Sequence, residues 1–112
     1  MPIYSKKCIA IKNDKERKDC SDKTMLMKVY FNIKYPYFAR NNGIQGSVVI
    51  QFIIDKEGKT KNHKVVKSIG GGCDEESLRV VKNFVQDWFK PGIQDNIPIN
   101  TIFNLPIRYR LE

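Results

Sequence analysis

The fold is decided by residues 101–111, which read TIFNLPIRYRL. Every second side chain from Phe103 to Leu111 is apolar and most of the others are polar, which is typical of a strand with one buried face. Pro106 has no N–H for a strand ladder, and proline in a sheet is confined to edge strands and bulges. Backbone N–H groups alternate sides along a strand. We therefore predict an edge strand whose free backbone groups belong to Ile102, Asn104 and Arg108.

An open edge of this kind has two interpretations. Unpaired main-chain groups are a template for another strand, and some proteins use them to capture an extended peptide. The same pattern also fits an edge protected against pairing, with Pro106, Arg108 and Arg110 discouraging an approaching strand. The alternation predicts the edge but no ligand, so both interpretations stay open at this point.

Two earlier segments supply the neighbours of this strand. Residues 46–55 carry apolar side chains at the even positions from 48 to 54 and are half apolar on the other face, which suits a central strand. A tight turn at residues 55–58 places Gly58 where a left-handed residue is needed. A more polar return strand is expected over residues 59–68.

The first predicted helix covers residues 24–32. Ser21 or Asp22 is its expected cap, and it must end before Pro36 because the residue before a proline avoids the α region. Residues 12–22 are interpreted as a charged linker, and one further helical turn is expected at residues 37–40.

The second predicted helix has Asp74 as its N-cap and runs to about Asp87. One face carries Leu78, Val81, Val85 and Trp88 at helical spacing. These elements predict an α+β fold in two layers: a three-stranded antiparallel sheet in spatial order two, one, three, with two helices on one face. Residues 23–112 form the domain, and residues 1–22 form a charged N-terminal extension.

Composition restricts the class of protein. The chain has 112 residues, of which 41% are hydrophobic and 29% charged, so one globular domain is expected. No apolar run approaches the roughly 20 residues that span a bilayer. The net charge of +8 favours anionic partners, but the basic residues are spread out and no nucleic-acid motif accompanies them. We expect a solvated basic surface and no nucleic-acid partner.

The cysteines and acidic residues do not indicate catalysis. Cys8 and Cys20 can form a disulfide in an oxidising compartment, and Cys73 has no nearby histidine to act as a base. The single histidine and scattered cysteines offer no zinc site. The three acidic residues after Gly72 are typical of a helix start. We expect no metal, no cofactor and no catalytic residues.

A set of short segments appears in a specific order along most of the chain. They are Tyr35-Pro36, Gly46-Ser47-Val48-Val49 with Phe52, Asp55-Lys56-Glu57-Gly58-Lys59, Val65-Val66-Lys67-Ser68, Cys73-Asp74-Glu75 with Leu78 and Val81, Phe89-Lys90-Pro91-Gly92, Pro98, and Leu105-Pro106-Ile107-Arg108-Tyr109. In this order and spacing they resemble the C-terminal domain of TonB, as found in TonB-like energy transducers. Asn96 stands where that family commonly has glycine, and asparagine also tolerates a positive φ.

The resemblance implies a periplasmic, non-enzymatic module that an upstream anchor would tether to inner-membrane motor proteins. It also implies capture of a short peptide of outer-membrane TonB-dependent receptors by strand addition at the last strand, which favours peptide capture over a protected edge. The expected peptide-binding residues are Tyr35, Ile102, Phe103, Asn104, Leu105 and Arg108.

A second hypothesis uses the same edge differently. Exposed edges also promote dimers and domain swaps, so a structural or assembly domain that pairs with itself as a homodimer is the alternative.

Overall fold

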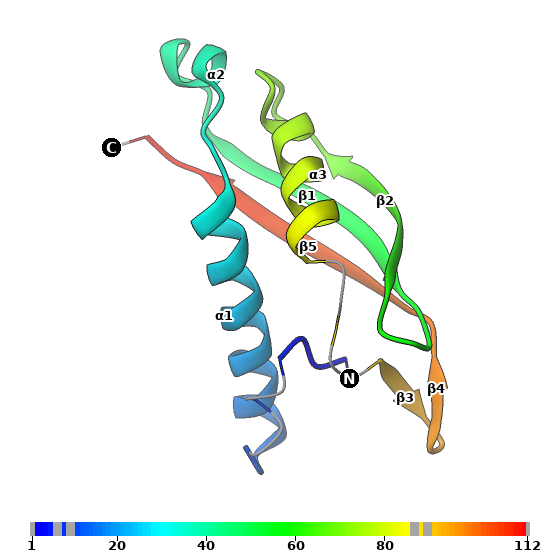
Figure 1. Ribbon diagram of the computed structural model, residues 1–112. Coiled ribbons are helices and arrows are strands. Elements are labelled where there is room, and N and C mark those ends of the chain that lie inside the picture. Colours follow the sequence, from blue (N-terminus) through cyan, green and yellow to red (C-terminus); the bar gives the residue numbers. More distant parts are fainter. Residues whose placement is uncertain (1, 6–7, 9–10, 86–87, 89–90, 112) are drawn as a thin grey trace.

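The computed structural model describes residues 2–5, 8, 11–85, 88 and 91–111. Its main element is a three-stranded antiparallel sheet in the order β2-β1-β5. The two longer helices, α1 and α3, pack on one face of it (Figure 1). The strands are β1 (Gly46–Ile54), β2 (Thr60–Lys67) and β5 (Thr101–Tyr109), and the helices are α1 (Asp14–Asn32) and α3 (Cys73–Phe84). The predicted fold class, strand order and helix placement are confirmed.

The central strand β1 contributes one face to the hydrophobic core. Its even-numbered side chains are fully buried, as the alternation predicts, and they are Val48, Ile50, Phe52 and Ile54. Helix α1 covers them with Met25 and Val29, and helix α3 covers them with Val80 and Val81. The odd-numbered side chains of β1 are only partly buried, because the described elements leave the opposite face of the sheet uncovered.

Helix α1 begins about ten residues earlier than predicted. Its cap is Asn13, whose Oδ1 accepts the Glu16 N–H at 3.1 Å, and neither Ser21 nor Asp22 has that role. Ser21 is instead buried, and its hydroxyl oxygen accepts the N–H of Tyr4 at 2.8 Å. The predicted charged linker at residues 12–22 is therefore mostly helix.

Local charge pairs and one covalent bond accompany this polar half of α1. Arg17 pairs with Asp14 at 2.8 Å and Lys18 pairs with Asp22 at 2.6 Å, both at spacings that face each other on a helix. A disulfide between Cys8 and Cys20 joins the chain before the helix to its second turn. None of these contacts produces the apolar periodicity from which helices are predicted.

Helix α3 also starts differently from the prediction. Gly72 is its N-cap at φ +87°, while Asp74 lies inside the first turn and accepts hydrogen bonds from the Ile69 N–H and the Ser68 hydroxyl. The helix ends at Phe84 with Val85 as its C-cap, short of the predicted end near residue 87, and residues 86–87 lie outside the described part.

Two small elements complete the architecture. Helix α2 (Tyr37–Asn41) is the helical turn expected after the proline. A hairpin of β3 (Gly92–Gln94) and β4 (Ile97–Ile99), which the sequence analysis did not predict, precedes β5. Its turn residues Asp95 and Asn96 have φ of +51° and +65°, the conformation that favours Asn and Gly in two-residue hairpin turns.

Candidate functional site

The outer edge of β5 is regular and open. Its antiparallel register with β1 runs without interruption from Gly46 opposite Tyr109 to Ile54 opposite Thr101. Pro106 lies opposite Val49, yet the ladder continues on both sides of it. This is possible because the proline's missing N–H belongs to the side of the strand that faces away from β1.

The amide of Arg108 confirms which side that is. It lies two residues beyond Pro106, so both point the same way, and it donates to the hydroxyl oxygen of Tyr30 on α1 at 3.1 Å. The amides of Ile102 and Asn104 share this direction, and within the described residues neither has a hydrogen-bond partner. Ile102 is 64% exposed. The predicted edge, with free main-chain groups at Ile102 and Asn104, is therefore confirmed, and Arg108 carries a contact that the sequence did not indicate.

A groove of about 430 Å³ lies between this edge and helix α1. Met25 and Leu26 give the helix wall an apolar centre, and the Lys18–Asp22 ion pair lies on the same wall. The strand wall consists of residues 102–106. The described lining residues are Lys18, Asp22, Met25, Leu26, Ile102, Phe103, Asn104, Leu105 and Pro106.

Helix α1 meets the edge of β5 at two places. Its residues Lys18, Asp22, Met25 and Leu26 line the groove opposite residues 102–106. Tyr30, about one turn after Leu26, contacts the Arg108 amide. The helix therefore forms the second wall of the groove and also touches the edge beyond it.

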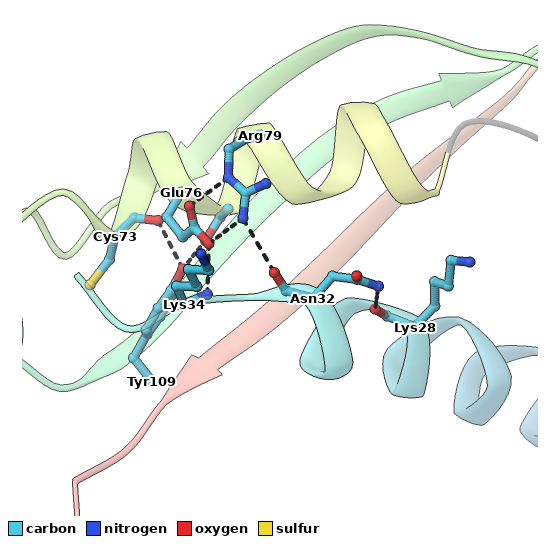
Figure 2. A network of polar contacts seen from close by, with 8 residues as sticks. Lys28, Asn32, Lys34, Cys73, Glu76, Arg79 and Tyr109 are labelled. Carbon is cyan, nitrogen blue, oxygen red and sulfur yellow. Dashed lines mark hydrogen bonds and ion pairs between the residues drawn. The ribbon is translucent and has the colours of Figure 1, made fainter.

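A polar network fixes the C-terminal end of α1 against α3 (Figure 2). The Arg79 guanidinium donates to the Asn32 carbonyl at 3.2 Å and to the Glu76 carboxylate at 2.7 and 2.8 Å. That carboxylate also accepts the Lys34 N–H at 2.7 Å. The last turn of α1 contains no basic residue, so Arg79 supplies the cation that favours a helix C-terminus.

The Glu76 carboxylate is held in its charged form by this network. The hydrogen bond from Arg79 lowers its pKa below the ordinary value, and the hydrogen bond from the Lys34 N–H acts in the same direction against partial burial. Helix α1 is thus fixed in place beside β5 by charge-assisted hydrogen bonds as well as by its buried side chains.

The C-terminal end of β5 is anchored to helix α3. The Tyr109 hydroxyl lies 2.9 Å from the Ser77 Oγ. It donates to the Cys73 carbonyl at 3.1 Å (Figure 2). Burial of this side chain raises its pKa well above the ordinary value, so it stays protonated. The edge strand is therefore held by its ladder to β1 and by a buried hydrogen bond to α3.

Tyr35 is placed apart from the residues that line the groove. Its hydroxyl donates to the Ile44 carbonyl, and its ring packs edge-on against Tyr109 with centroids 5.4 Å apart. Partial burial raises its pKa. In this structure Tyr35 supports the C-terminal end of β5.

The remaining sequence-predicted residues divide between two faces of β5. Ile102, Asn104 and Arg108 are exposed with outward-facing amides. Phe103 and Leu105 direct their main-chain groups to β1 and contribute side chains to the base of the groove. The Asn104 Oδ1 also accepts a hydrogen bond from the Gln51 side chain at 3.0 Å, across the uncovered face of the sheet.

The described residues do not assemble a metal-binding group. No three side chains of His, Cys, Asp or Glu lie close enough in the described part to hold a metal ion. Cys73 is buried, and its surroundings raise its pKa, while burial lowers the pKa of His63, whose ring packs against Phe52. None of the helices in the described ranges combines the length and apolar character that membrane crossing requires.

Comparison with known proteins gives one family. The profile described as "Gram-negative bacterial TonB protein C-terminal" matches residues 32–111, so the match begins at the last residue of α1. Protein TonB of Vibrio cholerae is 30% identical over 92 residues, which are 81% of this chain and 36% of that protein. The chain therefore spans little more than a third of that relative.

Two solved structures share the fold. Both are solution structures of the Helicobacter pylori TonB C-terminal domain, at 24% sequence identity. One has a TM-score of 0.62 and covers 79% of this chain and 90% of that chain; the other has a TM-score of 0.64 and covers 80% and 79%.

Proposed function

Because the chain belongs to the family of Gram-negative bacterial TonB C-terminal domains, we propose that it is the receptor-binding module of a TonB-like energy transducer. Domains of this family are interaction modules of energy transducers and not enzymes. The proposed partner is a short extended segment of an outer-membrane receptor, which adds as a strand to β5 in the periplasm. Force would come from inner-membrane motor proteins through an anchor outside the described domain.

The observation that carries this proposal is the open edge of β5. Two outward amides, at Ile102 and Asn104, have no partner among the described residues, and they lie beside a groove with apolar lining. Strand addition takes its affinity from main-chain hydrogen bonds and its specificity from alternate side chains. Ile102, Asn104 and Arg108 offer the main-chain groups, while Phe103 and Leu105 shape the groove.

The first prediction tests this pairing with Asn104→Pro. The substitution removes one outward N–H and places a ring where the added strand would lie, but Pro106 shows that the ladder to β1 tolerates proline on this side. We expect a folded protein whose affinity for receptor peptides falls by about tenfold or more. Calorimetric titration with peptides about as long as β5, taken from the periplasmic N-terminal segments of outer-membrane receptors, measures the change.

Asn104→Ala is the matched control for this substitution. It also loses the side-chain contact with Gln51, but it keeps the main-chain amide. Its affinity is expected to stay within about twofold of the wild type, since the exposed side chain lies on the uncovered face of the sheet and takes no part in main-chain pairing. A folded Asn104→Pro protein that binds these peptides with wild-type affinity would falsify strand addition at β5.

Self-pairing through the same edge is the alternative outcome of this experiment. Light scattering over a range of protein concentrations distinguishes the two functions. A tight dimer that ignores every receptor peptide and that Asn104→Pro dissociates would favour an assembly domain.

A further inference from the structure

The hydroxyl of Tyr30 occupies a position that a neighbouring strand would use. It accepts the outward N–H of Arg108 at 3.1 Å, near the 2.9 Å at which a strand carbonyl usually accepts an amide. The other outward amides of β5, at Ile102 and Asn104, remain without partners in the described part. One of the groups that an added strand would need is therefore taken by a side chain of α1.

Helix α1 has an exposed apolar surface around Tyr30, in addition to the buried face that covers the sheet. The inward face of α1 is formed by Ser21, Met25 and Val29, yet a second apolar surface continues around the helix. Tyr30 is 45% exposed and Phe31 is 90% exposed on it. This surface borders a shallow hollow of about 680 Å³ that shares Asp22 and Leu26 with the groove; its lining residues are Asp19, Asp22, Lys23, Leu26, Met27, Tyr30 and Phe31.

These observations place one side of α1, formed by Leu26 and Tyr30 and called the overhang below, above the open edge of β5. Leu26 lines the groove and Tyr30 reaches the edge amide, so this side of α1 lies over the space beside β5 and not over the three existing strands. A fourth strand in that space would be covered on one face by Leu26 and Tyr30, as β1 is covered by Met25 and Val29. Its side chains on that face would meet an apolar lining.

We propose that the Tyr30 hydroxyl substitutes for a captured strand in the free chain, where it accepts the hydrogen bond of the Arg108 N–H. When an extended peptide adds to β5, a main-chain carbonyl of the peptide replaces the hydroxyl as the acceptor. This inference rests on the proposed function and adds a positioning residue to it. The family match begins at residue 32, so the overhang lies outside the matched residues.

The overhang favours an extended peptide over a second copy of this chain. Two copies that joined through antiparallel β5 edges would form one continuous sheet, with both α1 helices on the same face. Each overhang would then cover the space that the other copy's β5 and α1 need. An extended peptide has no helix of its own and fits between β5 and the overhang.

The exchange makes a defined prediction for Tyr30→Phe. The substitution keeps the ring over the edge and removes only the oxygen that competes for the Arg108 amide. A typical net hydrogen bond corresponds to about a two- to tenfold change in an equilibrium constant, so Tyr30→Phe is expected to bind the peptide more tightly by that factor. Tyr37→Phe is the matched control, because Tyr37 lies on α2, is 79% exposed and makes no hydrogen bond through its hydroxyl to a described residue.

The test uses the full chain and the tightest-binding receptor peptide from the titration described above. Amide hydrogen exchange at Arg108 is measured first without peptide, where Tyr30→Phe is expected to raise the rate toward that of Asn104 while Tyr37→Phe leaves it unchanged. Peptide titrations of the three proteins follow, and Tyr30→Phe alone is expected to gain affinity.

The outcomes separate this inference from the proposed function. Peptide binding that is equal or weaker in Tyr30→Phe overturns the role of Tyr30 and leaves strand addition standing. An Arg108 amide that exchanges equally fast in wild type and Tyr30→Phe overturns it as well, whatever the peptide does. Absence of binding by both proteins removes the proposed function and this inference with it.

Discussion

The two edges of the sheet are built in opposite ways. The pairing of β2 with β1 is interrupted twice by register shifts, Asn62 in β2 has φ of +56°, and lysines point out along the strand at Lys61, Lys64 and Lys67. The pairing of β5 with β1 has no interruption, and a helix runs beside its open side. Bulges and lysines are the usual means by which proteins prevent strand addition.

The comparison shows that an open edge is not an unavoidable consequence of a small sheet. The same chain protects β2 with irregular backbone and charge, and it leaves β5 straight, with outward amides and an apolar groove. Pro106 does not close the edge of β5, because the amides of Ile102 and Asn104 remain available. The difference between the edges is therefore the physical basis on which β5, and not β2, is proposed as the binding strand.

The largest expected effect comes from moving a proline to the paired side of β5. Leu105→Pro removes an amide that faces β1 and replaces a side chain that is 1% exposed. We expect a loss of about 3 kcal/mol or more in the free energy of unfolding, which is a large part of a small domain's stability. Denaturant unfolding followed by circular dichroism measures it.

Asn104→Pro, one residue away, is the internal reference for that measurement. Its cost to folding is expected to stay below about 1 kcal/mol, because no ladder bond to β1 is lost. Equal destabilisation by the two prolines would show that the amides of residues 104 and 105 do not face away from β1 and toward β1, respectively.

A smaller effect is expected from the network that holds α1 beside β5. Glu76→Gln weakens the contacts to Arg79 and is expected to cost about 1 kcal/mol of unfolding free energy near neutral pH. The folded pKa of Glu76 lies below its ordinary value of 4.5. Its contribution is therefore complete above that value and is lost as the pH falls through the folded pKa.

Unfolding of wild type and Glu76→Gln at about pH 7 and about pH 3 tests this dependence. The two proteins should differ at neutral pH and converge in acid. Glu75→Gln is the control, since Glu75 lies in the same first turn of α3 and makes no ion pair with a described residue. A difference that persists unchanged in acid would contradict the assignment to the charged carboxylate.

The smallest effect is expected at the protected edge. Replacing Lys61 and Lys64 with alanine is expected to change the free energy of unfolding by less than about 0.5 kcal/mol and to leave peptide affinity within about twofold. Titration at moderate salt concentration limits the contribution of long-range charge. A large loss of affinity in this variant, comparable with that of Asn104→Pro, would move the binding edge from β5 to β2.

Much of the fold was accessible from local patterns. Strict alternation located β1 and β5, and Pro106 identified the edge because a missing amide has a direction. The first half of α1 was missed because its one buried residue is Ser21 and most of its other residues are charged, so no apolar stripe marks it. The β3–β4 hairpin was missed although Asp95-Asn96 between apolar residues is a turn signal.

The site was accessible only in part. The outward amides of β5 follow from the sequence, but the second wall of the groove depends on how α1 rotates over the sheet. Tyr30 follows Val29 directly in the sequence, but successive helical residues are 100° apart and Val29 already occupies the inward direction, so Tyr30 points to one side of the buried face. A contact between Tyr30 and the Arg108 amide, far apart in sequence, leaves no local signal.

Cys73 takes no part in the disulfide between Cys8 and Cys20, and this has a consequence for how the disulfide forms. With three cysteine thiols, two incorrect pairings compete with the native one, but the cysteines at 8 and 20 close a much shorter loop and so meet more often in the unfolded chain. Once folded, Cys73 is buried, and burial together with Asp74 and Glu75 keeps it as the unreactive thiol. The thiol of Cys73 is thus a poor nucleophile toward the native Cys8–Cys20 disulfide.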